Sequence, residues 1–443
     1  MAAPLLILLL LAGGVESDLG DALERSGIAR SGLGLIAGEA GGRVLLVHEA
    51  DRPLAPASNQ KLLTAAAALE RLGQGYRFTT TLGASAQGDL VVIGSGDPNL
   101  SGRFHDGDAD RILRLLAEDL AARGVMGVDG DLVLDASRFD DEFIHPDWPK
   151  DQLDRWYCAP VAALVLNDSC WDCTVHPGAA AGAPARVTIA PSLLPPALSL
   201  DCPTIDAGDH LVHIGRDADH DIVVRGRILR GSDGVTGNVA VRDPVLFFGR
   251  AFRAALAARG IVVEGALRVG REAIVRPLVL YHSPLDRTLK VMLTQSQNLY
   301  AECCFKLLGK GSFASAADGA REALRALGVP VEGLDPRDGS GLARTNRATA
   351  RALYAALQAL RDLPLFVEAL PSGGEGTLAR RYRDLGPRLR AKTGTIAGVS
   401  ALSGYVTGIR GGRYVFAILA NGASVAQSRR LQDLVVAALA KAP

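Results

Sequence analysis

The sequence places a hydroxyl and an amine three residues apart in Ser58-Asn59-Gln60-Lys61, the only Ser-x-x-Lys of the chain. The alanine-rich run that follows and stops at Gly73 predicts a helix opened by Ser58. Residues three apart on a helix share a face, so the Lys61 amine can reach the Ser58 hydroxyl. Such a pair could serve as a nucleophile and its base. The alternative is a helix cap at Ser58 with a solvated lysine one turn later.

Two further motifs supply partners for this pair. Ser296-Gln297-Asn298 and Lys392-Thr393-Gly394 follow it, in that order, towards the C-terminus. Lysine is scarce, because only seven of the 48 Lys and Arg residues are lysines, yet two of the seven lie in these motifs. An ammonium group can lose its proton in a protein, whereas a guanidinium group cannot. Lysine at both positions therefore indicates chemistry rather than simple charge.

The ordered set of three motifs is typical of active-site serine penicillin-binding proteins and serine β-lactamases. From about residue 30 to the C-terminus, the chain resembles a narrower family, the D-alanyl-D-alanine carboxypeptidase/endopeptidases. These are the low-molecular-mass class C penicillin-binding proteins, serine peptidase family S13. Relatives often carry Asp or another small polar residue where this chain has Gln297, and we expect little loss from that difference. The resemblance also rests on segments beyond the three motifs: Gly94 to Pro98, Tyr157 with Ala159 to Leu164, Leu299 to Glu302, Asp338 to Leu342 and Gly376 to Leu378.

The resemblance implies a role for each motif residue. Ser58 would be the nucleophile, Lys61 its base, and Ser296 the relay of a proton to the leaving nitrogen. Lys61 must be neutral at the moment of attack, and both desolvation and the nearby charge of Lys392 would lower its pKa. No metal or other cofactor is needed. The residues expected to bind the substrate carbonyl, the terminal carboxylate and the oxyanion are Asn298, Lys392, Thr393, Gly394 and Thr395.

The side chain of the stem peptide is expected to meet an acidic residue of the insertion. In relatives such a residue binds the amino group of the diamino acid, and the segment from Trp148 to Asp151 is the similar region here. Asp151 is the candidate, with Asp154 close behind, and the alternative for either is an ordinary surface carboxylate. The implied partners are peptidoglycan peptides, and β-lactam antibiotics as inhibitors that acylate the serine.

Hairpin and helix patterns at both ends of the chain predict an α+β fold. Alternating residues around Gly41-Gly42 and around Gly411-Gly412 predict one β-hairpin near each end of the chain. Residues 425–440 have the pattern of an amphipathic helix. One sheet built from both ends would make a penicillin-binding protein/β-lactamase-like transpeptidase domain that is split in the sequence.

The long separation between the first two motifs predicts a large insertion. Residues 79–276 are rich in short alternating segments that Gly, Asp and Pro interrupt, which is typical of one or two β-rich domains. We therefore expect a catalytic domain formed by residues 18–78 and 277–443 around an inserted region of residues 79–276.

Composition excludes several classes of protein. With 48% hydrophobic and 22% charged residues, the chain is not mainly disordered. Basic and acidic residues are equal in number, so nothing indicates nucleic-acid binding. A local group of arginines before Lys392 could attract an anionic substrate or form an ordinary solvated surface: Arg380, Arg381, Arg383, Arg388 and Arg390.

The apolar run from Pro4 to Ala12 predicts a signal peptide over residues 1–17 and a periplasmic protein. The run is too short to cross a bilayer as a helix, and no later run approaches that length, so no transmembrane anchor is expected. No Lys or Arg precedes it. Either the start codon is placed late or the segment is something else.

Six cysteines are consistent with an oxidising compartment. Cys170 and Cys173 lack the second pair that a zinc site requires. A disulfide that joins one of them to the other, or to Cys202, is expected in preference to metal. Cys303 and Cys304 lie in a predicted helix, where burial as small hydrophobic residues is expected.

The leading interpretation is a serine D-Ala-D-Ala carboxypeptidase that also cleaves D,D-peptide cross-links in peptidoglycan. One alternative is a β-lactamase or esterase of the same fold. The long insertion and the lack of a recognisable Glu loop after the second motif argue against it. Another is a non-catalytic cell-wall scaffold, which the retention of every motif residue with a chemical role disfavours.

Overall fold

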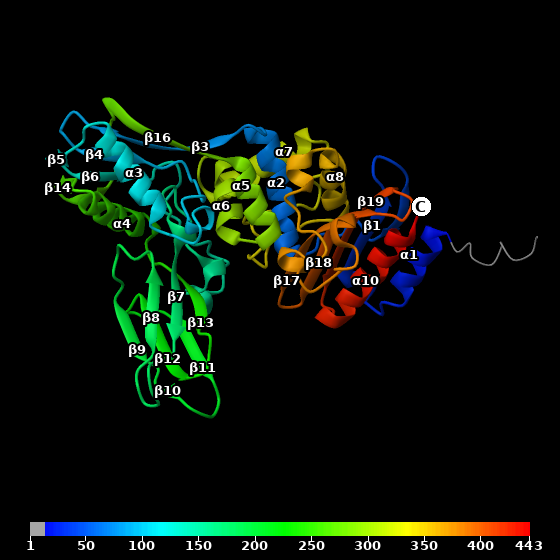
Figure 1. Ribbon diagram of the computed structural model, residues 1–443. Coiled ribbons are helices and arrows are strands. Elements are labelled where there is room, and N and C mark those ends of the chain that lie inside the picture. The colour runs from blue at the N-terminus through cyan, green and yellow to red at the C-terminus, as the bar shows by residue number, and fades with distance from the viewer. Residues whose placement is uncertain (1–13) are drawn as a thin grey trace, which may run out of the picture.

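A five-stranded antiparallel sheet unites the two ends of the chain in the computed structural model, which describes residues 14–443 (Figure 1). N-terminal Leu33 lies opposite C-terminal Ala420 in the register of the two strands that join the ends. Both predicted hairpins and the shared sheet are confirmed. In spatial order the strands are β17 (Leu389–Ile396), β18 (Val399–Thr407), β19 (Arg413–Asn421), β1 (Leu33–Glu39) and β2 (Val44–His48).

Helices cover both faces of this sheet. On one face α10 packs on β18 with α1 beside it, and their apolar residues form a core of their own with that side of the sheet. On the other face α8 packs on β1 and β19, and α2 lies beyond it between α6, α7 and α8. The helices are α1 (Val15–Glu24), α2 (Gln60–Leu72), α6 (Asn298–Leu307), α7 (Phe313–Ala326), α8 (Ala350–Leu360) and α10 (Val425–Lys441), with the short α5 (Leu285–Lys290) and α9 (Pro364–Val367).

Helix α2 is a core helix rather than a surface helix. Its first ten residues, Gln60 to Leu69, are all buried, and the four alanines among them allow neighbouring helices to approach closely. It ends at Gly73, as the sequence predicts, where φ is 84°. Burial on all sides fixes the N-terminal end of α2, where the first motif lies.

The inserted region begins with a mixed sheet and two helices that the strand patterns did not predict. The entering strand β3 pairs with the leaving strand β16, and Arg77 lies opposite Pro284. This pairing favours boundaries of the inserted region near residues 77 and 284, whereas the sequence predicts residues 79 and 276. The sheet order is β15 (Leu267–Val269), β6 (Leu132–Asp135), β4 (Leu90–Ile93), β3 (Arg77–Ala84) and β16 (Arg276–Pro284), and the helices are α3 (Arg111–Ala122) and α4 (Pro244–Ala258).

A second, all-β part of the insertion projects away from the rest of the molecule (Figure 1). One of its sheets has the order β13 (Val235–Ala240), β7 (Cys170–His176), β8 (Arg186–Ala190). The other contains β10 (Thr204–Ile205), β12 (Ile222–Leu229) and β11 (Leu211–Gly215), with β9 (Leu198–Asp201) paired to β12. A separate short pair joins β14 (Val262–Val263) to β5 (Gly127–Val128).

The prediction of a disulfide from Cys170 or Cys173 is wrong. All six cysteines lie within residues 14–443, and all are buried and free. Cys170 and Cys173 are an odd number of residues apart on β7, so their side chains point to opposite faces of the sheet. Cys202 follows β9 in the other sheet. Cys303 and Cys304 are buried in α6, as predicted.

The apolar run expected to form a signal peptide lies at residues 4–12, outside the residues that the structure describes. From residue 14 onward, no helix has both the length and the apolar character needed to cross a bilayer.

Candidate active site

The Ser-x-x-Lys motif lies where a short 3-10 turn, η2 (Ala57–Asn59), runs into α2. Ser58 is in the turn and Lys61 is in the first turn of the helix. Lys61 Nζ lies 3.2 Å from Ser58 Oγ, so the contact predicted from the spacing is present. Because η2 continues directly into a buried helix, both groups are held on rigid backbone.

Lys61 is fully buried and has three hydrogen-bond partners. Besides Ser58 Oγ, its Nζ donates to Asn298 Oδ1 over 2.7 Å and to the Ser340 carbonyl over 3.0 Å. A neutral amine has two N–H donors and one lone pair. Since the amide and carbonyl oxygens can only accept, the lone pair of a neutral Lys61 would face the Ser58 hydroxyl.

Charge and burial act in opposite directions on Lys61. Burial lowers its pKa to about 8, while the nearby carboxylates of Glu302 and Asp338 raise it. Glu302 also orients the Ser340 carbonyl, which accepts a hydrogen bond from Lys61. The Glu302 carboxylate accepts hydrogen bonds of 2.7 Å and 2.8 Å from the Gly339 and Ser340 N–H groups. Burial raises the pKa of Glu302 to about 8. The result is an amine that can be neutral near physiological pH.

Ser296 and Lys392 form a second hydroxyl–amine pair. Lys392 Nζ donates to Ser296 Oγ over 2.8 Å and to the Thr393 carbonyl over 2.9 Å. Lys392 is fully buried, and burial together with the charge of Lys61 holds its pKa well below the usual value. Ser296 has left-handed backbone angles, φ 62° and ψ 30°, directly after the π-helical segment η7 (Val291–Gln295).

Asn298 connects the second motif to the first motif and to the insertion. Its Oδ1 accepts from Lys61, and its Nδ2 donates to the Tyr157 carbonyl over 2.8 Å. Tyr157 belongs to η5 (Trp156–Cys158) of the inserted region. The insertion therefore takes part directly in holding the second motif.

Strand β17 runs close against η2. A Cβ atom on Gly394 would lie 2.9 Å from the Pro56 carbonyl oxygen and 3.0 Å from Ser58 N, so only glycine allows this approach. Asn59 Nδ2 donates to the Lys392 carbonyl over 3.0 Å and fixes the register of the two segments. Ser58 N and the backbone of Gly394 are thus close neighbours, in the two segments that would supply the donors of an oxyanion site.

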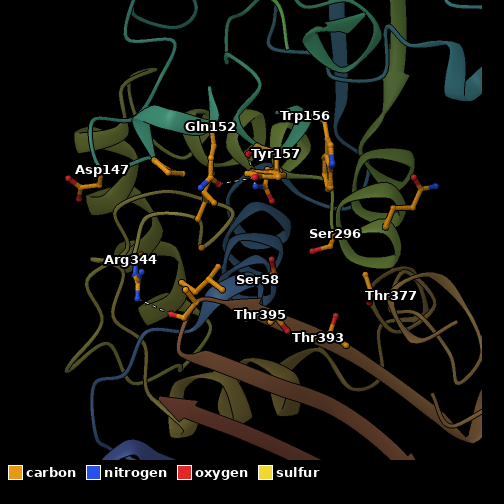
Figure 2. A pocket seen from close by; sticks show the side chains of 17 residues that line it. Ser58, Asp147, Gln152, Trp156, Tyr157, Ser296, Arg344, Thr377, Thr393 and Thr395 are labelled. Carbon is orange, nitrogen blue, oxygen red and sulfur yellow. Dashed lines mark hydrogen bonds between the residues drawn. The ribbon is translucent and has the colours of Figure 1, made fainter. Parts of the chain in front are cut away.

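The motif residues meet at one cavity of about 620 Å³ between β17 and the insertion (Figure 2). Lys61 and Lys392 are buried outside the lining. Within residues 14–443, no group of His, Cys, Asp and Glu side chains is arranged to hold a metal ion. The lining residues are Ser58, Asp147, Pro149, Gln152, Trp156, Tyr157, Gln295, Ser296, Asn298, Gly341, Leu342, Arg344, Thr377, Thr393, Thr395, Ile396 and Ala397.

Asp151 is not among the lining residues. It is exposed on η4 (Lys150–Gln152), while its neighbour Gln152 lines the cavity and accepts a hydrogen bond of 2.8 Å from the Tyr157 hydroxyl. Asp154 is half-buried and does not line the cavity either. The carboxylate that does so is that of Asp147, which accepts from Thr345 Oγ1.

The arginines before Lys392 do not line the Ser58 cavity. Three of them, Arg380, Arg381 and Arg388, line a separate cavity of about 510 Å³ beside α10. Arg381 pairs with Asp433, and Arg388 donates to the carbonyls of Thr407 and Ala440. These contacts favour a structural role over the attraction of substrate to Ser58.

Sequence reasoning assigned no role to several residues that shape the site. Glu302 and Ser340 lie in segments that carry the family resemblance, yet a backbone carbonyl such as that of Ser340 has no side-chain signal. Trp148 Nε1 donates to Asp338 Oδ2 over 2.9 Å and so joins the insertion to the loop that contacts Lys61.

Comparison with known proteins gives a consistent result over nearly the whole chain. A model of the D-Ala-D-Ala carboxypeptidase 3 (S13) family matches residues 15–442. A D-alanyl-D-alanine carboxypeptidase of Actinomadura sp. (strain R39) is 34% identical over 438 residues, which cover 90% of this chain and 79% of that protein. The D-alanyl-D-alanine carboxypeptidase DacB of Haemophilus influenzae is 26% identical over 405 residues, 83% of this chain and 80% of that protein.

Solved structures show the same fold. The crystal structure of penicillin binding protein 4 (dacB) from Haemophilus influenzae matches with a TM-score of 0.80 at 23% identity, covering 96% of this chain and 99% of that one. The same protein complexed with a novel β-lactam matches with a TM-score of 0.73 at 22% identity, covering 95% and 99%. The predicted α+β, penicillin-binding protein/β-lactamase-like fold is confirmed.

Proposed function

Because the chain belongs to the D-Ala-D-Ala carboxypeptidase 3 (S13) family, we propose that it removes the terminal D-alanine of peptidoglycan stem peptides through an acyl-enzyme on Ser58. One observation carries the proposal: the hydroxyls of Ser58 and Ser296, each hydrogen-bonded to a buried lysine, line the same cavity. A serine nucleophile, a neutral amine and a second hydroxyl suffice for acyl transfer to and from an ester.

Acylation begins with neutral Lys61. Its lone pair takes the proton of Ser58 while Oγ attacks the carbonyl carbon of the penultimate D-alanine. Negative charge develops on the carbonyl oxygen, where the N–H groups of Ser58 and Thr395 would stabilise it. The close approach that Gly394 permits places the backbone of β17 beside Ser58, where these two donors would act together.

Departure of D-alanine requires a proton on its nitrogen. Lys392 Nζ donates to Ser296 Oγ, so the Ser296 proton is free to point into the cavity towards the leaving nitrogen. Ser296 gives its proton to the nitrogen and regains the one that the Lys61 ammonium holds, so Lys61 is neutral again. Water then attacks the ester, Lys61 takes the water proton, and that proton returns to Ser58 Oγ as the ester bond breaks. The same sequence of steps cleaves a D,D-cross-link when the leaving amine belongs to a second stem peptide.

The free carboxylate of the substrate would bind Lys392 and Thr393. Burial and the charge of Lys61 hold the pKa of Lys392 well below the usual value. An arriving carboxylate supplies the missing opposite charge and raises that pKa, which favours the ammonium form. Binding of the terminal carboxylate is thereby coupled to protonation of Lys392.

A β-lactam presents a strained amide and a carboxylate to the same groups, so it is expected to acylate Ser58.

We place the enzyme in the periplasm, where peptidoglycan lies. For recognition of the substrate side chain we propose Asp151, which lies next to the cavity residue Gln152.

A β-lactamase of the same fold is the second candidate. Slow release of the penicilloyl group supports the peptidase, and rapid turnover of penicillin supports the lactamase.

The test measures release of D-alanine from a stem pentapeptide by the full chain. Ser58→Ala and Lys61→Arg should both lower kcat by at least about a hundredfold, since a guanidinium cannot act as the base. Lys306→Arg is the matched control, because Lys306 is equally buried but pairs with Asp140 away from the cavity. Wild-type kcat in Ser58→Ala would refute the proposal.

A further inference from the structure

A buried carboxylate of the insertion, Asp168, contacts the second motif. Asp168 is 7% exposed and lies in the turn η6 (Asn167–Ser169) that leads into β7. Its Oδ2 accepts a hydrogen bond of 2.9 Å from Gln297 Nε2, and its Oδ1 accepts one of 3.2 Å from the Tyr300 hydroxyl. Gln297 and Tyr300 lie on either side of Asn298 in the chain. Asp168 thus holds the start of α6, where Asn298 meets Lys61.

Arg103 extends this contact to the residue before Ser296. Its Nε donates to Asp168 Oδ2 over 2.6 Å, and its Nη1 donates to Gln295 Oε1. Gln295 precedes Ser296 and Gln297 follows it, so both neighbours of Ser296 are tied to one carboxylate. Ser296 itself has a φ of 62°, a conformation that non-glycine residues rarely adopt and that surrounding contacts must maintain.

The turn that carries Asp168 has an equally rare backbone. Asn167, Asp168 and Ser169 are all buried and have φ values of 47°, 58° and 54°. Three consecutive left-handed residues without a glycine are disfavoured, because each Cβ crowds the following carbonyl. Asn167 stabilises the turn, since its backbone N–H donates to the Leu100 carbonyl over 2.8 Å. Such backbone persists where the surroundings over-determine it, and it clusters at functional sites.

We propose that Asp168 is a positioning residue for acyl transfer, which fixes Ser296 and Asn298 against their lysine partners through Gln297 and Arg103. The inference rests on the proposed function. Asp168 does not line the Ser58 cavity, and it acts only through the second motif. Without its charge, Ser296 Oγ and Asn298 Oδ1 lose their fixed positions relative to Lys392 and Lys61. The chemical step should then slow, while the initial binding of a β-lactam is largely kept.

The test compares Asp168→Asn with Asp89→Asn in the full chain. Asp89 is 6% exposed, against 7% for Asp168, and each carboxylate pairs with a partly exposed arginine. Asp89 accepts hydrogen bonds from Arg268 over 3.0 Å and from the Asp131 N–H over 2.8 Å, and these residues lie in the insertion. It is therefore a matched control that leaves the contacts of Asp168 in place.

Stopped-flow measurement with a fluorescent penicillin separates the dissociation constant of the reversible complex from the acylation rate constant. Asp168→Asn should lower the acylation rate constant about tenfold or more, with the dissociation constant changed less than about threefold. Asp89→Asn should change both by less than about threefold. Equal losses in the two variants, or no loss in Asp168→Asn, would overturn the inference. If the wild-type chain forms no adduct at all, the proposed function falls as well.

Gln297→Ala gives a second test that does not remove a buried charge. It deletes one of the bonds to Asp168 and leaves the Arg103 contact intact. We expect an acylation rate constant lower by a factor of about three to ten, at a melting temperature within a few degrees of the wild type. A rate constant equal to that of the wild type would contradict the positioning role, whatever the stability of Asp168→Asn.

Discussion

The amine of Lys61 donates a hydrogen bond of 2.7 Å to Asn298 Oδ1, across a sequence separation of 237 residues. This bond joins α2 to α6 and so joins the first motif to the second. With the Ser340 carbonyl as a further fixed acceptor, it determines which direction of the amine remains for Ser58. The site is thus organised around the orientation of Lys61 as much as around its distance from the nucleophile.

The pH dependence of acylation should report Lys61. Only the neutral amine can take the Ser58 proton, and its pKa is lowered to about 8, so the acylation rate should rise as pH increases through about 8. Glu302→Gln removes a carboxylate that raises this pKa. The inflection should therefore move to lower pH in Glu302→Gln, as measured by penicillin acylation between about pH 6 and 10. A shift to higher pH would contradict this assignment.

Gly394→Ala should impair the oxyanion site without unfolding the protein. The new methyl group would lie 2.9 Å from the Pro56 carbonyl oxygen, so β17 must move away from Ser58. Loss of one such donor costs roughly a hundredfold to a thousandfold in kcat. Gly75→Ala is the control, because nothing lies within 4 Å of its Cβ position. Wild-type kcat in Gly394→Ala, measured as D-alanine release, would rule out this geometry.

Lys392→Met should remove the preference for a free chain end. We expect kcat/KM for a peptide that ends in D-alanine carboxylate to fall about a hundredfold, because a charge-assisted contact is lost. For the same peptide with an amidated C-terminus, kcat/KM should fall less. An equal fall for both peptides would assign Lys392 only to holding Ser296, its partner at 2.8 Å.

Asp151 can be tested against Asp147, the acid that lines the cavity. Asp151→Asn should raise KM several-fold for a stem peptide whose diamino acid carries a free amine, and leave KM for the N-acetylated peptide unchanged. If only Asp147→Asn shows this pattern, recognition of the amine belongs to the residue that the structure places in the lining.

Much of this site is predictable because side-chain chemistry leaves a pattern in the sequence. Ser58 and Lys61 are linked by helical spacing alone, and the hairpins at both ends of the chain predict a shared sheet. Ser296 and Lys392 are identified by their motifs, but no spacing rule shows that they contact each other. That contact depends on how α5 and η7 lead into the second motif, which is a property of the tertiary fold.

Other features of the site and of the fold leave no pattern in the sequence, and the reasons are physical. The Ser340 carbonyl is a backbone group, and any residue could supply it. A disulfide from Cys170 or Cys173 is expected from the sequence because no second Cys pair completes a zinc site, but strand geometry points these two side chains to opposite faces of the sheet. Asp168 gave no signal, since its role arises from a left-handed turn that brings it to Gln297 from 129 residues away.

Mass spectrometry identifies the residue that carries the acyl group, which we propose to be Ser58. The full chain is mixed briefly with benzylpenicillin, quenched in acid, digested and mapped. We predict one penicilloyl adduct, on the peptide that contains Ser58, and no adduct in Ser58→Ala under the same conditions. An adduct on another residue, or an adduct that persists in Ser58→Ala, would contradict the account.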